Sequence, residues 1–373
     1  MEGTAAAAPP PPIRLSDYDY TLPPDAIAQE PATPRDAARL LVLDRTTGAL
    51  AHRIFRDLPD LLRPDDLLVV NETRVTAVRL FGARELENGG ASIPVEVLLL
   101  RPVLEFSDTW EALVRPGRKV RPGDRVHFDE AGLRADVLSP TADGGRVLRF
   151  FSDDDIAERL ARHGRVPLPP YITTPLADSE RYQTVYARTP GSAAAPTAGL
   201  HFTPELFARL ENRGVRTAKV RLDVGLGTFR PIKTDDLDAH VMHEEAFEVP
   251  PETADAINAC RGRVVAVGTT TLRALETAAL SLPPGADARR VTPAKGETRL
   301  FVRPGHHFRA VDALVTNFHQ PHSTLLLLVG AFAGRTIDAG RAHLQAAYQT
   351  ALADGYRFLS LGDAMFIGDV SPA

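Results

Sequence analysis

The sequence predicts an α/β protein that carries a small all-β insert, and three observations support this fold class. Beyond residue 155, stretches with helical periodicity alternate with short apolar strands, which is typical of an α/β domain. Between about residues 80 and 151, β-type runs alternate with Gly, Pro and Asp turns at the spacing typical of barrels. A hairpin and a buried strand precede that region. We therefore assign residues 13–78 and 152–373 to a discontinuous α/β domain, residues 79–151 to the insert and residues 1–12 to a disordered tail.

The expected elements follow from local patterns along the chain. Two apolar strands flank a Thr-Thr-Gly turn, which predicts a hairpin over residues 40–56, and a buried strand follows at 66–70. In the insert, β-type runs lie at 94–100, 110–114, 125–128 and 146–151. Downstream, we expect helices at 156–162, 204–213 and 254–260, strands at 217–222 and 263–267, and a long surface loop at 281–297.

The composition is that of an ordinary globular protein and disfavours several other classes. With 373 residues, 44% of them hydrophobic, the chain can bury a large core in about two domains. The single cysteine, Cys260, excludes an intrachain disulfide and favours a reducing, cytoplasmic setting. Residues 1–12 lack the features of a signal peptide, and the apolar run near 325–333 falls short of the roughly 20 residues that span a bilayer. We expect no membrane segment.

The densest candidate site is a run of small residues at 191–204 that ends where a helix begins. Small side chains let a ligand approach the backbone, and Thr203 followed by Pro204 is a good helix start. His201 would then lie beside exposed amide donors that favour an anion or a polar ligand edge. The competing interpretation is a packing loop with a hydrogen-bonded structural histidine.

Two further segments repeat the pattern of strand, polar loop and helix. In residues 264–276 a buried strand runs through Gly-Thr-Thr-Thr into a helix, and Arg273 and Glu276 share one face three residues apart. They could grip the carboxylate and ammonium of an amino-acid ligand, although an ion pair on a solvated face is an equally open interpretation. In residues 311–324, Asn317 and His319 follow the end of a strand.

The run at residues 115–125 concentrates positive charge on the insert. With a formal net charge of −5, any RNA contact must come from such a local cluster. We predict a phosphate-contacting surface, and a solvated basic turn is the alternative. The candidate RNA-binding residues are Arg115, Arg118, Lys119 and Arg121.

Motifs for metals and nucleotides are weak or absent. The histidine pairs His240/His243 and His319/His322 belong to no zinc motif, so we expect no metal. The glycines at 225 and 227 do not extend into a dinucleotide fingerprint, and no P-loop sequence occurs. A Rossmann methyltransferase and a P-loop enzyme are therefore disfavoured.

Several motifs closely resemble one enzyme family, the S-adenosylmethionine:tRNA ribosyltransferase-isomerases of queuosine biosynthesis. The resemblance is carried by PTAGLHFT at residues 196–203, VGTTTLRALE at 267–276 and DALVTNFHQPHSTLL at 312–326. It extends through LSDYDYTLP at 15–23, LPPYI at 168–172, RYQTVYA at 181–187, VGLGTFRP at 224–231 and YRFLSLGDAMFI at 356–367. Nearly the whole chain after the tail is covered.

The resemblance implies both a fold and a reaction. The fold is a layered α/β domain interrupted by a small β-barrel. In the reaction, the ribosyl group of S-adenosylmethionine, a co-substrate, moves to 7-aminomethyl-7-deazaguanine at the wobble position of the tRNA anticodon. The product is epoxyqueuosine, and adenine and methionine leave. Neither a metal nor a redox cofactor is required, and we expect a cytoplasmic monomer.

The candidate catalytic residues are two histidines, either of which could remove the acidic proton beside the sulfonium. These are His201 and His319. The candidates for orienting the substrates are Asn71, Thr73, Arg74, Arg79, Pro196, Thr197, Gly199, Gly225, Gly227, Thr228, His243, Thr269, Thr270, Arg273, Glu276 and Asn317.

Three positions depart from the family pattern, and they keep two alternatives open. The family usually has a histidine where Asp223 stands, an asparagine at Glu72 and a proline at Ala77. One alternative is a paralogue with the same donor chemistry and another acceptor. The other is a non-catalytic RNA-binding protein that uses the insert, while a conventional methyltransferase is disfavoured by the missing glycine fingerprint.

Overall fold

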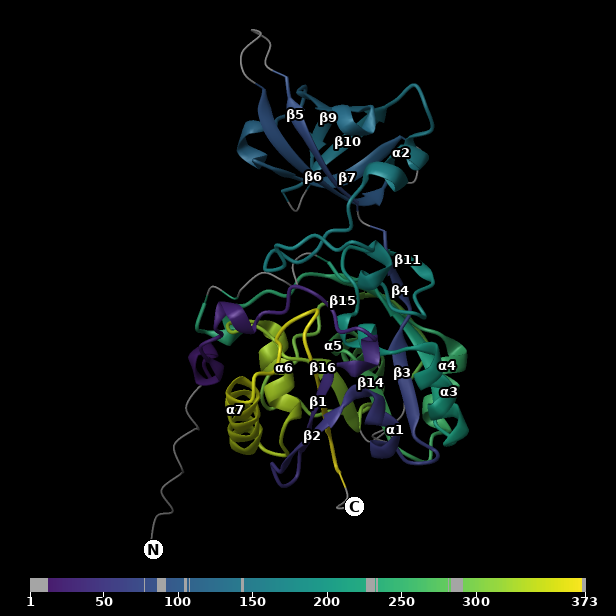
Figure 1. The fold of residues 1–373 in the computed structure, drawn as a ribbon, viewed down its shortest axis with the longest axis vertical. Helices are drawn as coiled ribbons and strands as arrows, with labels where there is room; N and C mark the ends of the chain where they lie inside the picture. Colours follow the sequence, from purple (N-terminus) through teal and green to yellow (C-terminus); the bar gives the residue numbers. More distant parts are fainter. Residues whose placement is uncertain are drawn as a thin grey trace, which may run out of the picture.

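The protein consists of a large mixed sheet covered by helices and a closed β-barrel that stands beyond one edge of it (Figure 1). The computed structural model describes residues 13–76, 78–85, 92–103, 106, 108–141, 144–225, 232, 234–280, 282 and 291–370. The predicted tail at 1–12 lies outside these residues. The predicted fold class, a layered α/β domain with an inserted β-barrel, is confirmed.

Within the described residues, the large sheet has nine strands in the order β15-β13-β12-β3-β14-β16-β17-β1-β2. Its central strands β12, β3, β14 and β16 run parallel, whereas β17 is antiparallel to β16. The carboxyl ends of these four parallel strands therefore lie at the same edge of the sheet. The bounds are β1 Arg39–Asp44, β2 Leu50–Ile54, β3 Leu67–Asn71, β12 Arg216–Leu222, β13 Glu245–Val249, β14 Val264–Val267, β15 Ala294–Thr298, β16 Ala313–Asn317 and β17 Ala364–Gly368.

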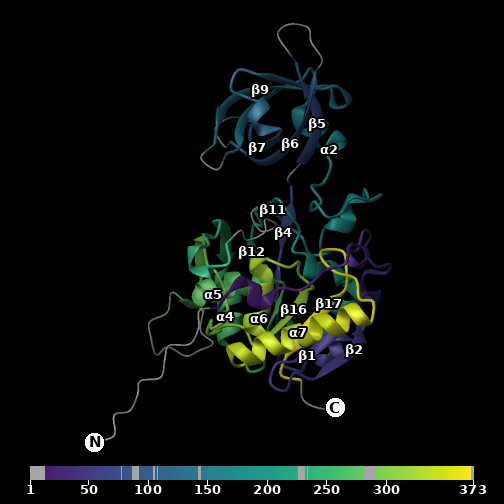
Figure 2. The same ribbon diagram turned by 90° about the vertical axis from the view of Figure 1, so that its left-hand side faces the viewer.

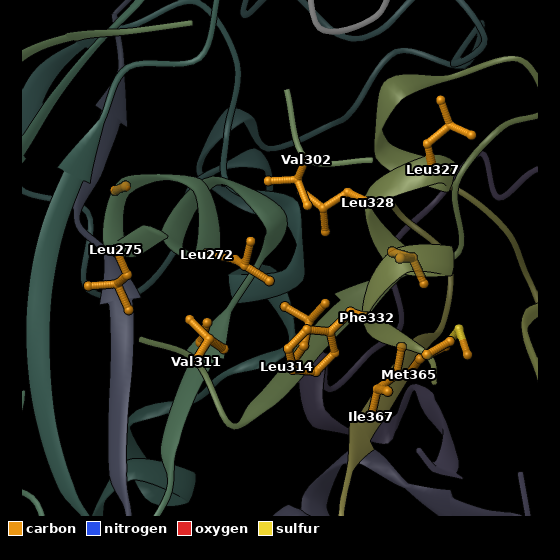
Figure 3. Packing of buried hydrophobic residues seen from close by; sticks show 14 of the residues in the cluster. Leu272, Leu275, Val302, Val311, Leu314, Leu327, Leu328, Phe332, Met365 and Ile367 are labelled. Atoms are coloured by element: carbon orange, nitrogen blue, oxygen red, sulfur yellow. The ribbon is translucent and has the colours of Figure 1, made fainter. Parts of the chain in front are cut away.

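Helices cover both faces of the sheet, which explains why β3, β14 and β16 are buried at every position. On one face, Leu272 and Leu275 of one helix and Leu328 and Phe332 of another pack against Leu314 of β16 (Figure 3). The opposite core contains Val265 of β14 and the helix starting at Pro204. The helices are α1 Leu58–Leu61, α2 Ile156–His163, α3 Pro204–Asn212, α4 Pro251–Asn258, α5 Thr269–Leu280, α6 Thr324–Phe332 and α7 Ile337–Ala353.

The barrel has its own core and is reached through the carboxyl end of β3. The chain leaves β3, forms β4 (Thr73–Val75), which pairs with β11 (Thr189–Ser192), and then enters the barrel (Figure 2). Six antiparallel strands close in the order β10-β7-β6-β5-β8-β9. They are β5 Val78–Arg84, β6 Ile93–Pro102, β7 Thr109–Arg115, β8 Arg125–Phe128, β9 Leu133–Pro140 and β10 Arg146–Phe151.

Most predicted elements are present, and one loop prediction is wrong in part. The hairpin predicted over residues 40–56 is the β1–β2 pair. The surface loop predicted at 281–297 contains strand β15, which pairs with β13 and so extends the sheet. Its Ala-Lys-Gly-Glu-Thr sequence is mostly exposed on this edge strand and lacks the apolar alternation that signals a strand. Residues 283–290 of that loop lie outside the described residues.

Candidate functional site

A pocket, here called the strand-end pocket, opens at the carboxyl edge of the sheet beside the ends of β14 and β16. Its empty space, including the open mouth, is about 650 Å³. The lining residues are Tyr171, Ala195, Pro196, Thr197, Ala198, Val224, Gly268, Thr269, Thr270, Thr316, Asn317, Phe318, His319, Gln320, Ser323, Leu325, Leu359 and Ser360.

Two helices begin at this pocket. Gly268 adopts a φ of +89°, which favours glycine, and the chain turns there from β14 directly into α5. Ser323 caps α6 by accepting a hydrogen bond from the Leu326 amide at 3.1 Å. Helix N-termini carry partial positive charge, so this edge of the sheet favours electron-rich ligand groups.

Asn317, at the end of β16, offers the pocket a donor that the described residues do not use. Its Oδ1 accepts a hydrogen bond from the Thr197 hydroxyl at 2.9 Å, which fixes the orientation of the amide. Its Nδ2 has no hydrogen-bond partner among the described residues, although the residue is only 3% exposed. Buried amide groups are nearly always satisfied, so this donor indicates a ligand acceptor in the pocket.

Asn71, at the end of β3, supports the pocket from behind. Its Nδ2 donates to the Leu222 carbonyl at 2.8 Å and to the Thr270 hydroxyl at 3.3 Å. Its Oδ1 accepts from the amides of Thr73 and Leu222. Asn71 thus connects β3 to β12 and orients Thr270. Thr270 lines the pocket, whereas Asn71 does not.

His319 lies in the pocket wall and is held at both its ring and its backbone. Its Nε2 lies 2.8 Å from the Thr316 hydroxyl. Its carbonyl accepts from the Tyr20 hydroxyl at 2.5 Å, and its amide donates to the Tyr348 hydroxyl at 2.9 Å. Burial lowers the pKa of His319 to about 3, so the imidazole is neutral at pH 7.

His201 is placed differently from the sequence-based expectation. Thr203 does cap α3, accepting from the Leu206 amide at 3.1 Å. However, His201 does not line the pocket and instead packs against Phe55, with ring centroids 4.8 Å apart. Burial lowers its pKa to about 4, and its Nε2 has no partner among the described residues. The short helical turn at Thr197–His201 directs Thr197 to the pocket and His201 into the core around Phe55 and Phe202.

Arg273 and Glu276 were expected either to bind an amino-acid ligand or to form an ion pair on a solvated face. Instead, both are buried and neither lines the pocket. Arg273 pairs with Glu245 of β13, and its Nε donates to the Leu300 carbonyl at 3.1 Å. Glu276 accepts the backbone amides of residues 309, 310 and 311 at 2.9–3.2 Å. Both side chains therefore stabilise the loops around α5 from outside the pocket lining, and Arg273 Nη2 has no hydrogen-bond partner among the described residues.

The other substrate candidates divide clearly between lining and distant positions. Pro196, Thr197, Thr269 and Thr270 line the pocket as expected. The Gly225 amide donates to Glu245 Oε1 at 3.0 Å, adjacent to the lining residue Val224. Gly199 packs against Tyr186 outside the pocket. Gly227 and Thr228 lie outside the described residues.

Three charged or titratable candidates lie away from the pocket. Arg74 forms an ion pair with Glu180 at 2.5 Å. Arg79, on β5 of the barrel, pairs with Glu96 at 2.9 Å. His243 is exposed before β13 and does not line the pocket.

Glu72 and Asp223, two of the positions that depart from the family pattern, form ion pairs with residues of β12. Glu72 forms an ion pair with Lys219 at 3.3 Å. Asp223 binds Arg221 at 2.6 Å and accepts from the Thr73 hydroxyl, also at 2.6 Å. Both carboxylates are thereby neutralised beside β12, outside the pocket lining. Ala77 lies outside the described residues.

The basic turn, defined as Arg115, Arg118, Lys119 and Arg121, is exposed at the end of β7 and in the following short helical turn. None of the four side chains forms an ion pair with the described residues. Arg125, which follows, differs because it binds Asp136 at 2.7 Å. The turn therefore presents uncompensated positive charge to solvent.

Sequence reasoning missed several lining residues that come from distant loops. Tyr171 and Ser360 join their hydroxyls at 2.6 Å across the pocket rim. Leu359 adopts a φ of +68°, which is uncommon for a bulky residue. The signal was present in the LPPYI and YRFLSLGDAMFI motifs, but neither segment has the strand-to-helix pattern by which the other candidates were chosen.

The described residues contain neither a cluster of metal ligands nor a membrane-spanning helix. Among them, no group of three or more His, Cys, Asp or Glu side chains is arranged to hold a metal ion. None of the helices in the described part of the chain is both long and apolar enough to cross a bilayer.

The chain is similar along most of its length to several known proteins. The S-adenosylmethionine:tRNA ribosyltransferase-isomerase of Symbiobacterium thermophilum is 53% identical over 95% of this chain and its own full length. That of Heliobacterium modesticaldum is 51% identical over the same shares. The crystal structure of S-adenosylmethionine tRNA ribosyltransferase from Thermotoga maritima is 39% identical, with a TM-score of 0.51 over 94% of this chain and 99% of that one. The family described as queuosine biosynthesis protein matches residues 15–367, and the chain belongs to that family.

Proposed function

We propose that this chain is an S-adenosylmethionine:tRNA ribosyltransferase-isomerase. It moves the ribosyl group of S-adenosylmethionine onto 7-aminomethyl-7-deazaguanine in tRNA and gives epoxyqueuosine, adenine and methionine. The names of its relatives support the reaction class. The observation that carries the assignment to this site is the unused Asn317 amide, which shares a buried pocket with a neutral histidine.

In the proposed mechanism, His319 is the general base. The sulfonium makes the hydrogens on the adjacent ribose carbon acidic, and His319 removes one of them through a ring nitrogen. The electron pair left on carbon forms a double bond to the next ribose carbon as that carbon's bond to the ring oxygen breaks. The freed oxygen forms a carbonyl at the anomeric carbon, and adenine leaves with the electron pair of the glycosidic bond and takes up a proton. The remaining sugar is an unsaturated sulfonium. Because Thr316, Tyr20 and Tyr348 fix the ring and the peptide of His319, the base is positioned before the substrate binds.

The second half of the reaction requires little more than positioning from the protein. The aminomethyl nitrogen of the tRNA base adds to the unsaturated sulfonium and loses a proton, and the resulting carbanion beside sulfur bonds to the carbonyl carbon, which closes a five-membered carbocycle. The former ring oxygen, now an alkoxide, then forms the epoxide by displacing methionine, which departs with the electron pair of its carbon–sulfur bond. Asn317, Thr269 and Thr270 orient the donor, and the N-termini of α5 and α6 favour its electron-rich groups.

Product analysis tests this function. Purified protein incubated with S-adenosylmethionine and tRNA that carries the deazaguanine base is expected to release free adenine and methionine. S-adenosylhomocysteine as the product would identify a methyltransferase instead. An intact glycosidic bond in the donor with every acceptor would contradict the proposal.

Two histidine variants test the base assignment. We expect His319→Ala to slow adenine release by about 10²- to 10⁴-fold, the usual contribution of a general base. His201→Ala is the matched control, because its ring is also enclosed and neutral but lies outside the pocket, and the folded fraction should turn over near the parent rate. Parent turnover by His319→Ala would exclude it as the base.

A further inference from the structure

A second hollow, here called the junction groove, lies where the barrel meets the main domain. It is lined by Arg79 and Phe81 of β5 and by residues between 164 and 179, and its empty space is about 1010 Å³. The backbones of Arg79 and Arg165 pair across it through two hydrogen bonds of 2.8 and 2.9 Å. The groove is therefore built on ordered backbone of both parts of the molecule.

Phe81 presents an aromatic surface to this groove. Its neighbour Leu80 points into the barrel core, so Phe81 points outward, and it remains 54% exposed. The guanidinium carbon of Arg165 lies 5.3 Å from the centroid of its ring. An exposed aromatic ring beside a cation is the combination that binds unpaired nucleotides, since every base has a face that can stack.

Positive charge continues from the groove along the outer face of the barrel. In the strand register, Phe81 lies opposite Glu96, and Glu96 lies opposite Arg115. Strands are about 4.8 Å apart, so Arg115 of the basic turn is roughly 10 Å from Phe81 on the same face. Glu96 is neutralised by Arg79 and does not repel a phosphate.

One chain segment separates the junction groove from the strand-end pocket. Tyr171 lines the pocket, whereas the next residues, Ile172 and Thr173, line the groove. On the barrel side, Leu98 packs against Ala193, which is two residues before the lining residue Ala195. A strand of RNA held in the groove would therefore have its adjoining nucleotide near the pocket.

We propose that the junction groove binds an unpaired nucleotide of the RNA acceptor. Its base stacks on Phe81, and its phosphate lies near Arg165. This inference rests on the proposed function and extends it, because it assigns a binding site for a nucleotide that is not itself modified. The occupant is RNA rather than a protein segment because Phe81 and the Arg165 guanidinium lie together in the groove, and Arg115, which forms no ion pair with the described residues, follows on the same face of the barrel.

The test compares two phenylalanines of equal exposure. Phe106 is also 54% exposed but does not line the groove, so Phe106→Ala is the matched control for Phe81→Ala. Binding of a synthetic anticodon stem-loop RNA is measured by fluorescence anisotropy. We expect Phe81→Ala to weaken binding roughly 5- to 150-fold, the range for loss of one stacked base. Phe81→Trp should retain binding, and Phe106→Ala should match the parent.

Further readouts separate the groove from the catalytic site and from misfolding. For Phe81→Ala, the KM for tRNA should rise while kcat at saturating tRNA and the affinity for S-adenosylmethionine stay within about twofold. Arg165→Gln keeps the ring and should also weaken RNA binding. Equal RNA affinity for Phe81→Ala and Phe106→Ala, or failure of Phe81→Trp to bind, would overturn the proposal. Because the binding assay needs no turnover, this result is independent of whether adenine is released.

Discussion

The carboxyl edge of the large sheet and the outer face of the barrel both carry polar side chains, but they hold them in opposite ways. At the sheet edge, Asn71 is fully buried and bonded to backbone groups, and Glu276 of α5 is held in the same way beside the residues that lead into β16. On the barrel, the basic turn is exposed and has no ion pair with the described residues. A small ligand needs donors fixed in a low dielectric, whereas a polyanion is bound by charges that stay hydrated until contact.

The largest expected effect tests the buried side of this comparison. Glu276 is 0% exposed and accepts three backbone amides, so Glu276→Ala leaves several donors unsatisfied and creates a void. We expect the free energy of unfolding to fall by about 3 to 5 kcal/mol. Chemical denaturation followed by circular dichroism measures this change.

The matched control lies on the barrel. Glu111 accepts instead from an arginine side chain, that of Arg101, at 3.0 and 3.2 Å, and the Arg101 side chain is 69% exposed. Glu111→Ala should cost less than about 1 kcal/mol, as exposed ion pairs do. Similar losses for the two variants would mean that burial does not separate the two regions.

The sequence predicted the parts of the site that depend on strand ends. Thr269, Thr270, Asn317 and His319 follow strands that are recognisable as apolar runs, and parallel strands bring their carboxyl ends together. The basic turn was predictable for a different reason, because a run of cations in a turn stays exposed whatever the fold. The fold class was predictable for a related reason, since hydrophobic periodicity is a local property.

The roles of other candidate residues depend on partners that are distant in sequence, so the spacing between residues could not predict them. Arg273 and Glu276 share a helix face at i and i+3, but their partners are 28 and 34 residues away in sequence. The identity of Glu245 as the partner of Arg273 follows only from the pairing of β13 with β12. The position of His201 was unpredictable for a similar reason, because one short helical turn decides which side of the segment faces the pocket.

The next effect concerns the buried histidine and pH. Burial lowers the pKa of His201 to about 4, whereas an unfolded chain protonates its histidines near 6.5. The unfolded state therefore binds more protons as the pH falls from 6.5 towards 4, and the stability of the native protein declines over that window. His201→Phe should flatten this dependence by up to about 3 kcal/mol across the window. His319 contributes in the same direction, so a residual slope is expected.

Denaturation curves recorded between pH 4 and 7 measure the effect. The barrel provides a structural comparison, because the His127 side chain is 31% exposed beside Glu85, so His127→Phe removes no fully buried ring. A slope for His201→Phe equal to that of the parent would show that this ring is protonated as readily in the folded protein as in the unfolded chain.

The smallest effect per residue tests the exposed side of the comparison. Removal of one cation that binds a phosphate should reduce the slope of log affinity against log salt concentration by about 0.7 to 0.9. The double variant Arg118→Gln/Lys119→Gln is therefore expected to lower that slope by about 1.5 and to weaken tRNA binding several-fold at low salt. Titrations of labelled tRNA at a series of salt concentrations give the slope.

Arg125→Gln is the control that tests why the residues of the basic turn, and not other exposed arginines, should bind tRNA phosphates. Arg125 is also exposed, but its guanidinium already binds the Asp136 carboxylate through two hydrogen bonds of 2.7 and 3.3 Å. Binding to a phosphate would have to break that pair, so the variant should change the slope little. An equal change for Arg125→Gln would mean that exposure alone, and not the lack of a carboxylate partner, selects the residues that meet the RNA. The contrast with the sheet edge would then lie in burial and not in pairing.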